Sequence, residues 1–200
     1  MYKDIIKELK PADDVIAGVI EVYDNVIDVC DLIIDTANMM DGWRDAEIYN
    51  FDEDDERYVN KNYRSNIILD INGNEFTTHP LFSYTNVVVH RYFDAYCAKY
   101  NFGYDYIEAT QMLKYFKNDH YDAHFDSGPR FPRVVSGLLY LNDVRSGGET
   151  YFENFNVSVK PKAGRLVIFP SNYAYSHAAL PVKKGEKNVF VYWAREQRLD

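Results

Sequence analysis

The second half of the chain alternates short apolar runs with clusters of turn-forming residues. From Tyr106 onward the runs are rich in β-branched and aromatic residues, and the segments between them include SGPRFP, RSGG, KPKAG and KKGE. Runs bounded in this way are typical of β-strands joined by turns. The runs are YIEATQMLKYF, RVVSGLLYLNDV, TYFENFNVSV, GRLVIFP and KNVFVYWA. Because no helical pattern lies between them to serve as a crossover, they predict an antiparallel double-sheet jelly roll.

The first half begins with a predicted strand and a predicted helix. Val15–Asp24 reads VIAGVIEVYD and is typical of a strand. Between Val26 and Met40 the apolar residues recur at steps of four and three, as they do on the buried face of an amphipathic helix. Asp24 or Asn25 is predicted to cap this helix, and Gly42 is predicted to end it.

A second helix is predicted after Pro80. Its apolar face consists of Phe82, Val89, Phe93, Tyr96 and Tyr100. Before it, the acidic stretch at 51–57 is predicted to be an exposed loop, and INGN at 71–74 is predicted to be a turn. The two helices are expected to support a sheet.

The composition favours a single domain. The 200 residues are 46% hydrophobic and 16% aromatic, which is enough for a sizeable core, and no repeat or Pro/Gly/Ser-rich linker divides them. We therefore expect one α+β domain over residues 1–200. Residues 1–105 are expected to supply helical support and the first strands, and residues 106–200 a double-stranded β-helix, or jelly roll.

Charge and cysteine content exclude several classes of function. The net charge of −9 disfavours nucleic acid as a partner, because that affinity comes largely from clustered Lys and Arg. The first residues, MYKDIIKELKPADD, lack the apolar core of a signal peptide, and no run is long and apolar enough to span a membrane. We expect a cytoplasmic protein with no membrane partner. Cys30 and Cys97 lie in helical patterns and are expected to be buried free thiols.

Three polar residues of the second half form a candidate metal site. His124 and Asp126 are separated by one residue, so on a strand both side chains point to the same face. They are either two metal ligands or polar residues that end a strand. His177, after GRLVIFP, would complete the set of two imidazoles and one carboxylate that holds non-haem Fe(II) and leaves coordination positions open. His79, His90 and His120 are not expected to be ligands.

Five segments between Tyr106 and Glu196 follow one another in an informative order. They are YFKNDHYDAHFD, RVVSGLLYLNDVRSGGETYF, VSVKPKAGRLVIFP, SHAALPVKKGEKN and YWARE. In this order they resemble the catalytic core of the 2-oxoglutarate- and Fe(II)-dependent dioxygenases, specifically the prolyl 4-hydroxylase group. Where that family usually has Gly and Gln, this chain has Asn118 and Asp119. Since Asn tolerates a positive φ better than most residues, the turn is expected to be kept.

The resemblance implies a role for nine residues. His124, Asp126 and His177 match the iron ligands. Lys187 matches the basic residue that pairs with the distal carboxylate of 2-oxoglutarate, and Tyr115 and Thr150 match side chains that hydrogen-bond the same carboxylate. Tyr121, Arg133 and Trp193 match positions near the target proline. Taken alone, Arg133 would be interpreted as a surface charge rather than as a substrate contact.

The chemistry of Lys187 agrees with this role. A lysine inside a barrel loses hydration and needs a compensating anion. In KNVFVYW, the period of two places Lys187, Val189, Val191 and Trp193 on one face. The cation and the indole are therefore expected to lie on the same side of the strand.

These residues together predict an Fe(II)- and 2-oxoglutarate-dependent dioxygenase that uses O2 and releases succinate and CO2. The resemblance implies hydroxylation of a prolyl residue in a peptide or protein, with ascorbate as a further candidate cofactor. One alternative is a hydroxylase of a free amino acid or another small molecule, and another is a non-enzymatic jelly-roll binding module. A nucleic-acid demethylase is disfavoured, because those relatives have arginines where Lys187 stands and because the chain is acidic.

Overall fold

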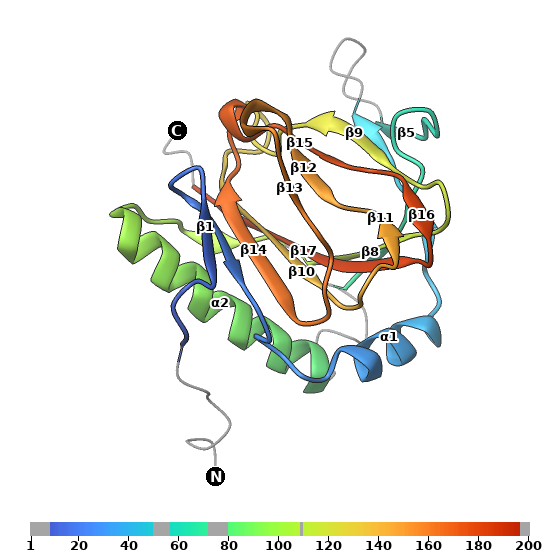
Figure 1. Cartoon of the computed structure of the whole chain (residues 1–200), viewed down its shortest axis with the longest axis horizontal. Helices are drawn as coiled ribbons and strands as arrows, with labels where there is room; N and C mark the ends of the chain where they lie inside the picture. The colour runs from blue at the N-terminus through green and yellow to red at the C-terminus, as the bar shows by residue number, and fades with distance from the viewer. Residues whose placement is uncertain (1–8, 50–56, 72–79, 109, 197–200) are drawn as a thin grey trace.

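The computed structural model describes residues 9–49, 57–71, 80–108 and 110–196. Among these residues, nine strands form a large antiparallel sheet, here called the major sheet (Figure 1). Its strands in spatial order are β1 (Asp14–Ile16), β2 (Ile20–Tyr23), β14 (Arg165–Pro170), β10 (Arg133–Tyr140), β17 (Lys187–Arg195), β8 (Gln111–Tyr115), β6 (Ile67–Asp70) and β3 (Arg44–Asp45), with β7 (Tyr106–Ile107) paired to β17.

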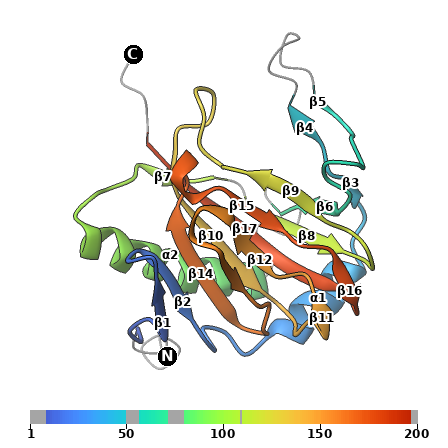
Figure 2. The same ribbon diagram turned by 45° about the horizontal axis from the view of Figure 1, so that its top comes forward.

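A smaller sheet faces the major sheet (Figure 2). Its strands in spatial order are β13 (Val157–Val159), β12 (Thr150–Phe152), β15 (His177–Ala179) and β9 (Tyr121–His124). Two short ribbons complete the described strands: β4 (Ile48–Tyr49) with β5 (Arg57–Tyr58), and β11 (Ser146–Gly147) with β16 (Val182–Lys184). Two 3-10 turns, η2 (Glu153–Phe155) and η3 (Tyr173–Tyr175), lie beside one another. The predicted jelly roll is confirmed.

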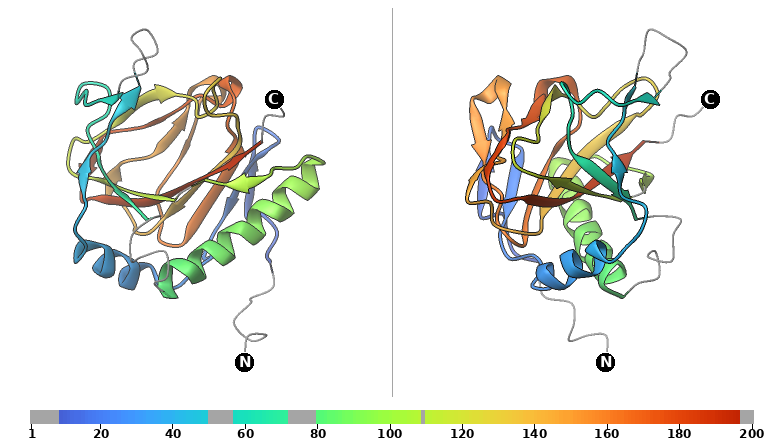
Figure 3. Two further views of the ribbon diagram at one scale, coloured as in Figure 1. Left: turned by 180° about the vertical axis from the view of Figure 1, so that it is seen from behind. Right: turned by 90° about the vertical axis from the view of Figure 1, so that its right-hand side faces the viewer.

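Both predicted helices cover the outer face of the major sheet, away from the smaller sheet (Figure 3). They are α1 (Cys30–Asn38) and α2 (Pro80–Tyr100). Along β10 the residues alternate as a strand requires, so that Leu139 packs with the helices and Leu138 packs between the two sheets. Gly137 lies on the helical face, where a Cβ would come within 2.6 Å of the Phe93 ring. Because this position has no side chain, α2 packs closely against the sheet.

Two local predictions were wrong in detail. The single strand predicted for Val15–Asp24 is a hairpin of β1 and β2, because Ala17 and Gly18 take positive φ values of 49° and 79° and reverse the chain. The first helix begins at Cys30, and its N-cap residue Val29 provides no side-chain hydrogen bond.

Asp24 does not cap that helix because its carboxylate has other partners. It accepts hydrogen bonds from Arg165 at 2.6 Å and from Lys162 at 2.8 Å, and so joins the end of β2 to the loop before β14. The hydrogen bond from Arg165 lowers the pKa of Asp24 most, and Lys162 lowers it further. Burial raises this pKa, but the two cations outweigh it and the pKa is about 2.

Other local predictions hold or fall outside the described residues. Cys30 and Cys97 are buried and free, as predicted. Most of the acidic stretch at 51–57 and of the turn at 71–74 lies outside the described residues. No helix among the described residues is long and apolar enough to span a membrane.

Candidate active site

A cavity of about 610 Å³ opens between the inner faces of the two sheets. The major sheet contributes apolar side chains to its wall, including Leu113, Leu138 and Val191. The smaller sheet contributes polar ones, above all His124 and His177. The arrangement places the candidate metal ligands over an apolar floor.

The pairing of β9 with β15 brings the two histidines together. In this antiparallel pair His177 lies opposite His124, and the centroids of the imidazole rings are 4.4 Å apart. Asp126 lies two residues after the end of β9, and its backbone N–H donates to the Ser171 carbonyl at 3.1 Å. Residues 53 positions apart therefore meet because two strand ends are in register.

The three side chains converge as a metal site requires. Their ligand atoms lie within 4.8 Å of one another, and the Asp126 carboxylate is 3.7 Å from His124 Nε2 and 3.8 Å from His177 Nε2. The Nδ1 atoms of the histidines lie 2.8 and 3.1 Å from the carbonyls of Asp122 and Tyr175. A proton on Nδ1 makes these hydrogen bonds, so Nε2 keeps its lone pair and faces the cluster.

The electrostatics also favour a bound cation. Burial, together with the neighbouring His177, lowers the pKa of His124 to about 3, so that its imidazole is neutral near pH 7. Burial opposes ionisation of Asp126, but His177 and His124 together lower its pKa to about 2. Ser136 donates to the Asp126 carboxylate at 2.6 Å and fixes its orientation. Two imidazoles and one carboxylate are a donor set that suits Fe(II).

Lys187 lies in the same cavity and is 2% exposed. In the pairing of β17 with β8 it stands opposite Tyr115, and its Nζ lies 4.9 Å from the centroid of the Tyr115 ring and 5.4 Å from that of Tyr140. Burial lowers its pKa to about 7, against a smaller opposing influence of Glu149. Among the described residues no carboxylate forms an ion pair with it. The cavity therefore contains a buried amine that gains from an anionic ligand.

Tyr140 lies in the core between the two sheets and was not among the site residues predicted from the sequence. It is fully buried on β10, and its hydroxyl donates to Thr150 Oγ1 at 2.7 Å. Thr150 and Tyr115 both line the cavity with Lys187. The only sequence signal for Tyr140 was its inward position in the period of β10. The Lys187 ammonium group therefore lies over the rings of Tyr115 and Tyr140.

Tyr121, Arg133 and Trp193 also line the cavity. The Tyr121 ring stacks on His124 with centroids 3.6 Å apart, and the Arg133 guanidinium lies 3.8 Å from the centroid of the Trp193 ring. Arg133 also donates two hydrogen bonds to Glu108, at 2.6 and 3.1 Å. Arg133 is thus a partly buried, oriented residue of the cavity, which the surface-charge alternative did not anticipate.

The other described histidines, His90 and His120, are not part of the cluster. His120 contacts Ser65 and the Asn62 carbonyl, and the metal-site geometry does not include it. His90 lies on α2, and His79 lies outside the described residues. Asn118 has a φ of 72°, so the turn before β9 is kept, as predicted.

A family comparison identifies this arrangement. Residues 110–195 match the model of the 2OG-Fe(II) oxygenase superfamily. This segment is therefore similar to the catalytic domain of the 2OG-Fe(II) oxygenases. The match contains every ligand of the cluster and Lys187, and the resemblance of the sequence to this superfamily is confirmed.

Individual proteins similar to the chain are described as prolyl 4-hydroxylases. The chain is 36% identical over 138 residues to a protein of Acanthamoeba polyphaga mimivirus described as a putative prolyl 4-hydroxylase. It is 34% identical over 125 residues to prolyl 4-hydroxylase 13 of Arabidopsis thaliana. These matches cover 58% and 48% of this chain, and 56% and 46% of the relatives. The chain thus spans about half the length of the curated relatives it matches.

Solved structures share the fold. A prolyl hydroxylase of Trichoplax adhaerens, in complex with a hypoxia inducible factor peptide fragment, aligns with a TM-score of 0.73 at 19% identity over 90% of this chain and 84% of that one. A viral collagen prolyl hydroxylase of Paramecium Bursaria Chlorella virus-1 aligns with a TM-score of 0.64 at 19% identity, over 90% of this chain and 98% of that one.

Proposed function

We propose that the chain is an Fe(II)- and 2-oxoglutarate-dependent dioxygenase that hydroxylates a prolyl residue of a peptide or protein and releases succinate and CO2. The observation that carries the proposal is the presence, in one cavity, of the cluster of His124, Asp126 and His177 together with the buried amine of Lys187. The first group supplies ligands for iron, and the second supplies a charge for the co-substrate.

Each cofactor has its own residues. His124, Asp126 and His177 would hold the iron, and Ser136 would keep the Asp126 carboxylate oriented. Lys187 would bind the distal carboxylate of 2-oxoglutarate, with hydrogen bonds from Tyr115 and Thr150. When bound, the iron supplies the activation of O2 that C–H hydroxylation requires. The apolar floor excludes water from the reacting groups.

The prolyl substrate is supported by the relatives and by the cavity wall. Several relatives are named prolyl 4-hydroxylases, and one structural neighbour holds a peptide. Tyr121, Arg133 and Trp193 would contact the substrate on the metal side of the cavity. An indole and a phenol ring provide flat apolar surfaces for a pyrrolidine ring. A free amino acid remains the alternative substrate, and ascorbate remains a predicted accessory cofactor.

The test combines co-substrate turnover with product mass. Protein loaded with Fe(II) under anaerobic conditions is given O2, 2-oxoglutarate and a set of proline-containing peptides. We expect succinate, and a peptide that gains one oxygen atom only when iron and 2-oxoglutarate are both present. Lys187→Met should abolish both products, whereas Lys184→Met, which removes an exposed lysine of β16, should leave them unchanged.

Two outcomes would contradict the proposal. Failure of the iron-loaded protein to produce succinate with any peptide or amino acid would favour a non-enzymatic binding module. Succinate formation coupled to oxygen gain by free proline, but by no peptide, would favour the small-molecule alternative.

A further inference from the structure

The cavity has a charge opposite to that of the whole chain. Of the described residues that line it, five are cationic and three are acidic, although the chain carries a net charge of −9. The cationic residues are Arg44, Arg57, Arg64, Arg133 and Lys187, and the acidic ones are Glu47, Glu108 and Asp126. A positive concave surface in an acidic protein concentrates anionic ligands.

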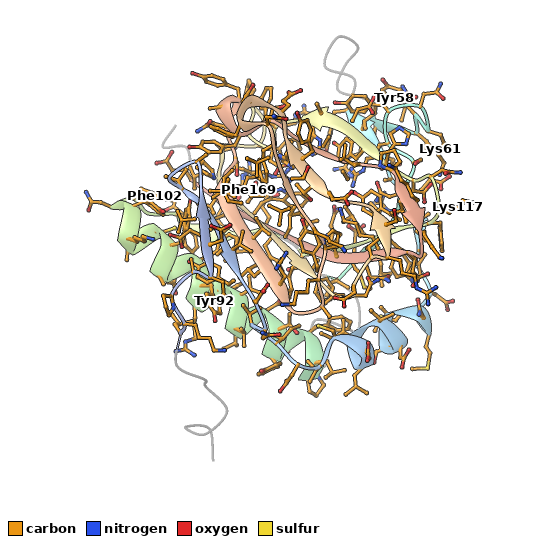
Figure 4. All side chains as sticks on the ribbon, in the orientation of Figure 1. Tyr58, Lys61, Tyr92, Phe102, Lys117 and Phe169 are labelled. Atoms are coloured by element: carbon orange, nitrogen blue, oxygen red, sulfur yellow. The ribbon has the colours of Figure 1, made fainter. Side chains whose placement is uncertain are left out.

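Most of this positive charge already has a role. Arg44 pairs with Asp70 at 2.7 Å and with Glu47 at 3.2 Å. Arg133 pairs with Glu108. Lys187 is assigned to the distal carboxylate of 2-oxoglutarate in the proposed function. Arg57 lies on the exposed strand β5, whose other residue, Tyr58, is seen at the edge of the molecule (Figure 4). Arg64 is the remaining cation.

The Arg64 guanidinium is held in place, and none of the described carboxylates pairs with it. Its Nε donates to Asn66 Oδ1 at 3.0 Å, and its Nη1 donates to the Glu47 carbonyl at 3.2 Å. Both acceptors are uncharged, and among the described residues no carboxylate pairs with Arg64. A guanidinium has five N–H donors, so most of them are left for a ligand in the cavity.

Arg64 is also close to the metal site. Its backbone bridges to Tyr121 of β9, and its guanidinium lies 4.5 Å from the centroid of the Tyr121 ring. That ring stacks on His124, so a single aromatic ring separates the guanidinium from a metal ligand. Burial raises the pKa of Tyr121 to about 12, and the charge of Arg64 opposes part of this rise. The charge of Arg64 therefore acts on Tyr121, which contacts a metal ligand.

We propose that Arg64 binds a carboxylate of the primary substrate, and that the substrate therefore carries an acidic group close to the carbon that is hydroxylated. This inference rests on the proposed function, because it assigns a feature of the substrate of that site. A guanidinium binds a carboxylate through two parallel hydrogen bonds, which fixes position as well as charge. Arg64 would thus determine which substrate is accepted and how it is oriented.

The carboxylate has two chemical sources. It can be the side chain of Asp or Glu beside the target proline, or it can be an α-carboxylate, as in a free amino acid or a C-terminal proline. Both present the same planar anion to the guanidinium. Peptides with blocked ends carry only side-chain carboxylates, so they separate the two sources.

The experiment measures binding and turnover on matched peptides. N-acetylated, C-amidated proline peptides carry Glu, Gln or Lys at each flanking position in turn, and a second set ends in proline with a free carboxylate. Binding is measured by fluorescence anisotropy with the Fe(II)- and 2-oxoglutarate-loaded protein under anaerobic conditions. Oxygen gain is then measured in air. Three proteins are compared: the unaltered chain, Arg64→Gln and Arg44→Gln.

We expect the unaltered chain to bind one acidic peptide about tenfold or more tightly than its neutral counterpart, the size of a hydrogen-bonded charge pair. Arg64→Gln should remove this preference without weakening the neutral peptide or raising the KM for 2-oxoglutarate. Arg44→Gln removes the same charge from the same wall and should keep the preference, because the charge of Arg44 is already paired. The blocked and free-ended sets show which source of carboxylate is used.

Three results would overturn the inference. Glu and Gln peptides could bind the unaltered chain equally, Arg64→Gln could weaken all peptides alike, or it could raise the KM for 2-oxoglutarate. The binding data decide the inference even if no peptide gains oxygen. Absence of oxygen gain from every peptide is instead the failure of the proposed prolyl hydroxylation, so the two failures are distinguishable.

Discussion

Raising the pH slightly above neutrality should weaken the binding of 2-oxoglutarate, because Lys187 then loses its proton. An ordinary lysine has a pKa of about 10.4 and stays charged throughout this range. Burial lowers the pKa of Lys187 to about 7, and Glu149 restores only part of the difference. The free protein therefore contains a growing fraction of neutral Lys187 as the pH passes 7, and the neutral amine attracts no carboxylate.

The size of the effect follows from that pKa. The carboxylates of 2-oxoglutarate ionise near pH 4 and do not change above neutrality, so only the charged fraction of Lys187 varies. With a pKa of about 7, this fraction falls by about 25-fold between pH 6.5 and pH 8.5, and the apparent Kd rises by the same factor. Binding at the higher pH must also take up a proton, since the bound anion stabilises the ammonium form.

Isothermal titration calorimetry on anaerobic, Fe(II)-loaded protein measures both quantities. The apparent Kd gives the affinity, and the dependence of the heat on buffer ionisation gives the proton uptake. Lys187→Arg should bind 2-oxoglutarate with an affinity that does not change over this range, since a guanidinium stays charged. Lys184→Met should follow the unaltered chain. An affinity of the unaltered chain that is equal at pH 6.5 and 8.5 would refute the reasoning.

Three substitutions test other parts of the structure. Ser136→Ala removes the 2.6 Å hydrogen bond to Asp126 and should weaken Fe(II) binding by about ten- to a hundredfold, as measured by competition with a chelating dye. Gly137→Ala places a methyl group 2.6 Å from the buried ring of Phe93 and should lower the free energy of unfolding by about 1–3 kcal/mol in urea denaturation. Asn118→Val puts a β-branched residue at a φ of 72° and should cost about 1–2 kcal/mol in the same assay.

Matched substitutions make these results interpretable. Ser158→Ala removes an exposed hydroxyl of β13 and should leave Fe(II) binding unchanged. Gly103→Ala adds a methyl group where nothing lies within 4 Å and should leave stability nearly unchanged. Equal effects of the test and matched substitutions would mean that the Asp126 hydrogen bond or the contact of Gly137 with α2 has no special importance.

The parts of the site that were predictable lie on strands with a clear period. The alternation in KNVFVYW placed Lys187 and Trp193 on one face, and both line the cavity. His124 and Asp126 were predicted to share one face of a strand, and their side chains do converge, although β9 ends at His124 and Asp126 lies beyond it. For Lys187 and Trp193, the two-residue repeat of the strand was enough to predict the position in the structure without knowledge of any partner.

Errors arose where a long-range partner decides the local structure. Asp24 and Asn25 have the residue types of a helix cap, but the Asp24 carboxylate pairs with Arg165, which lies 141 positions away. Val15–Asp24 has the composition of one strand, but the positive φ values at Ala17 and Gly18 make it two. Local propensity is a weak prior, and such ion pairs and turns outweigh it.

Arg64 and Glu108 could not have been found by the same reasoning, and the cause is physical. The period of a strand predicts which way a side chain points. It does not predict whether a charged side chain forms an ion pair with a neighbour or is left to bind a ligand. Arg133 and Arg64 are similar in sequence terms. Glu108 pairs with Arg133, whereas the described residues that accept hydrogen bonds from Arg64 are uncharged. That difference depends on which acidic residue the fold brings within hydrogen-bonding distance. The proposed substrate contact of Arg64 therefore depends on contacts between segments that are far apart in the sequence. The period of a single strand does not predict such contacts.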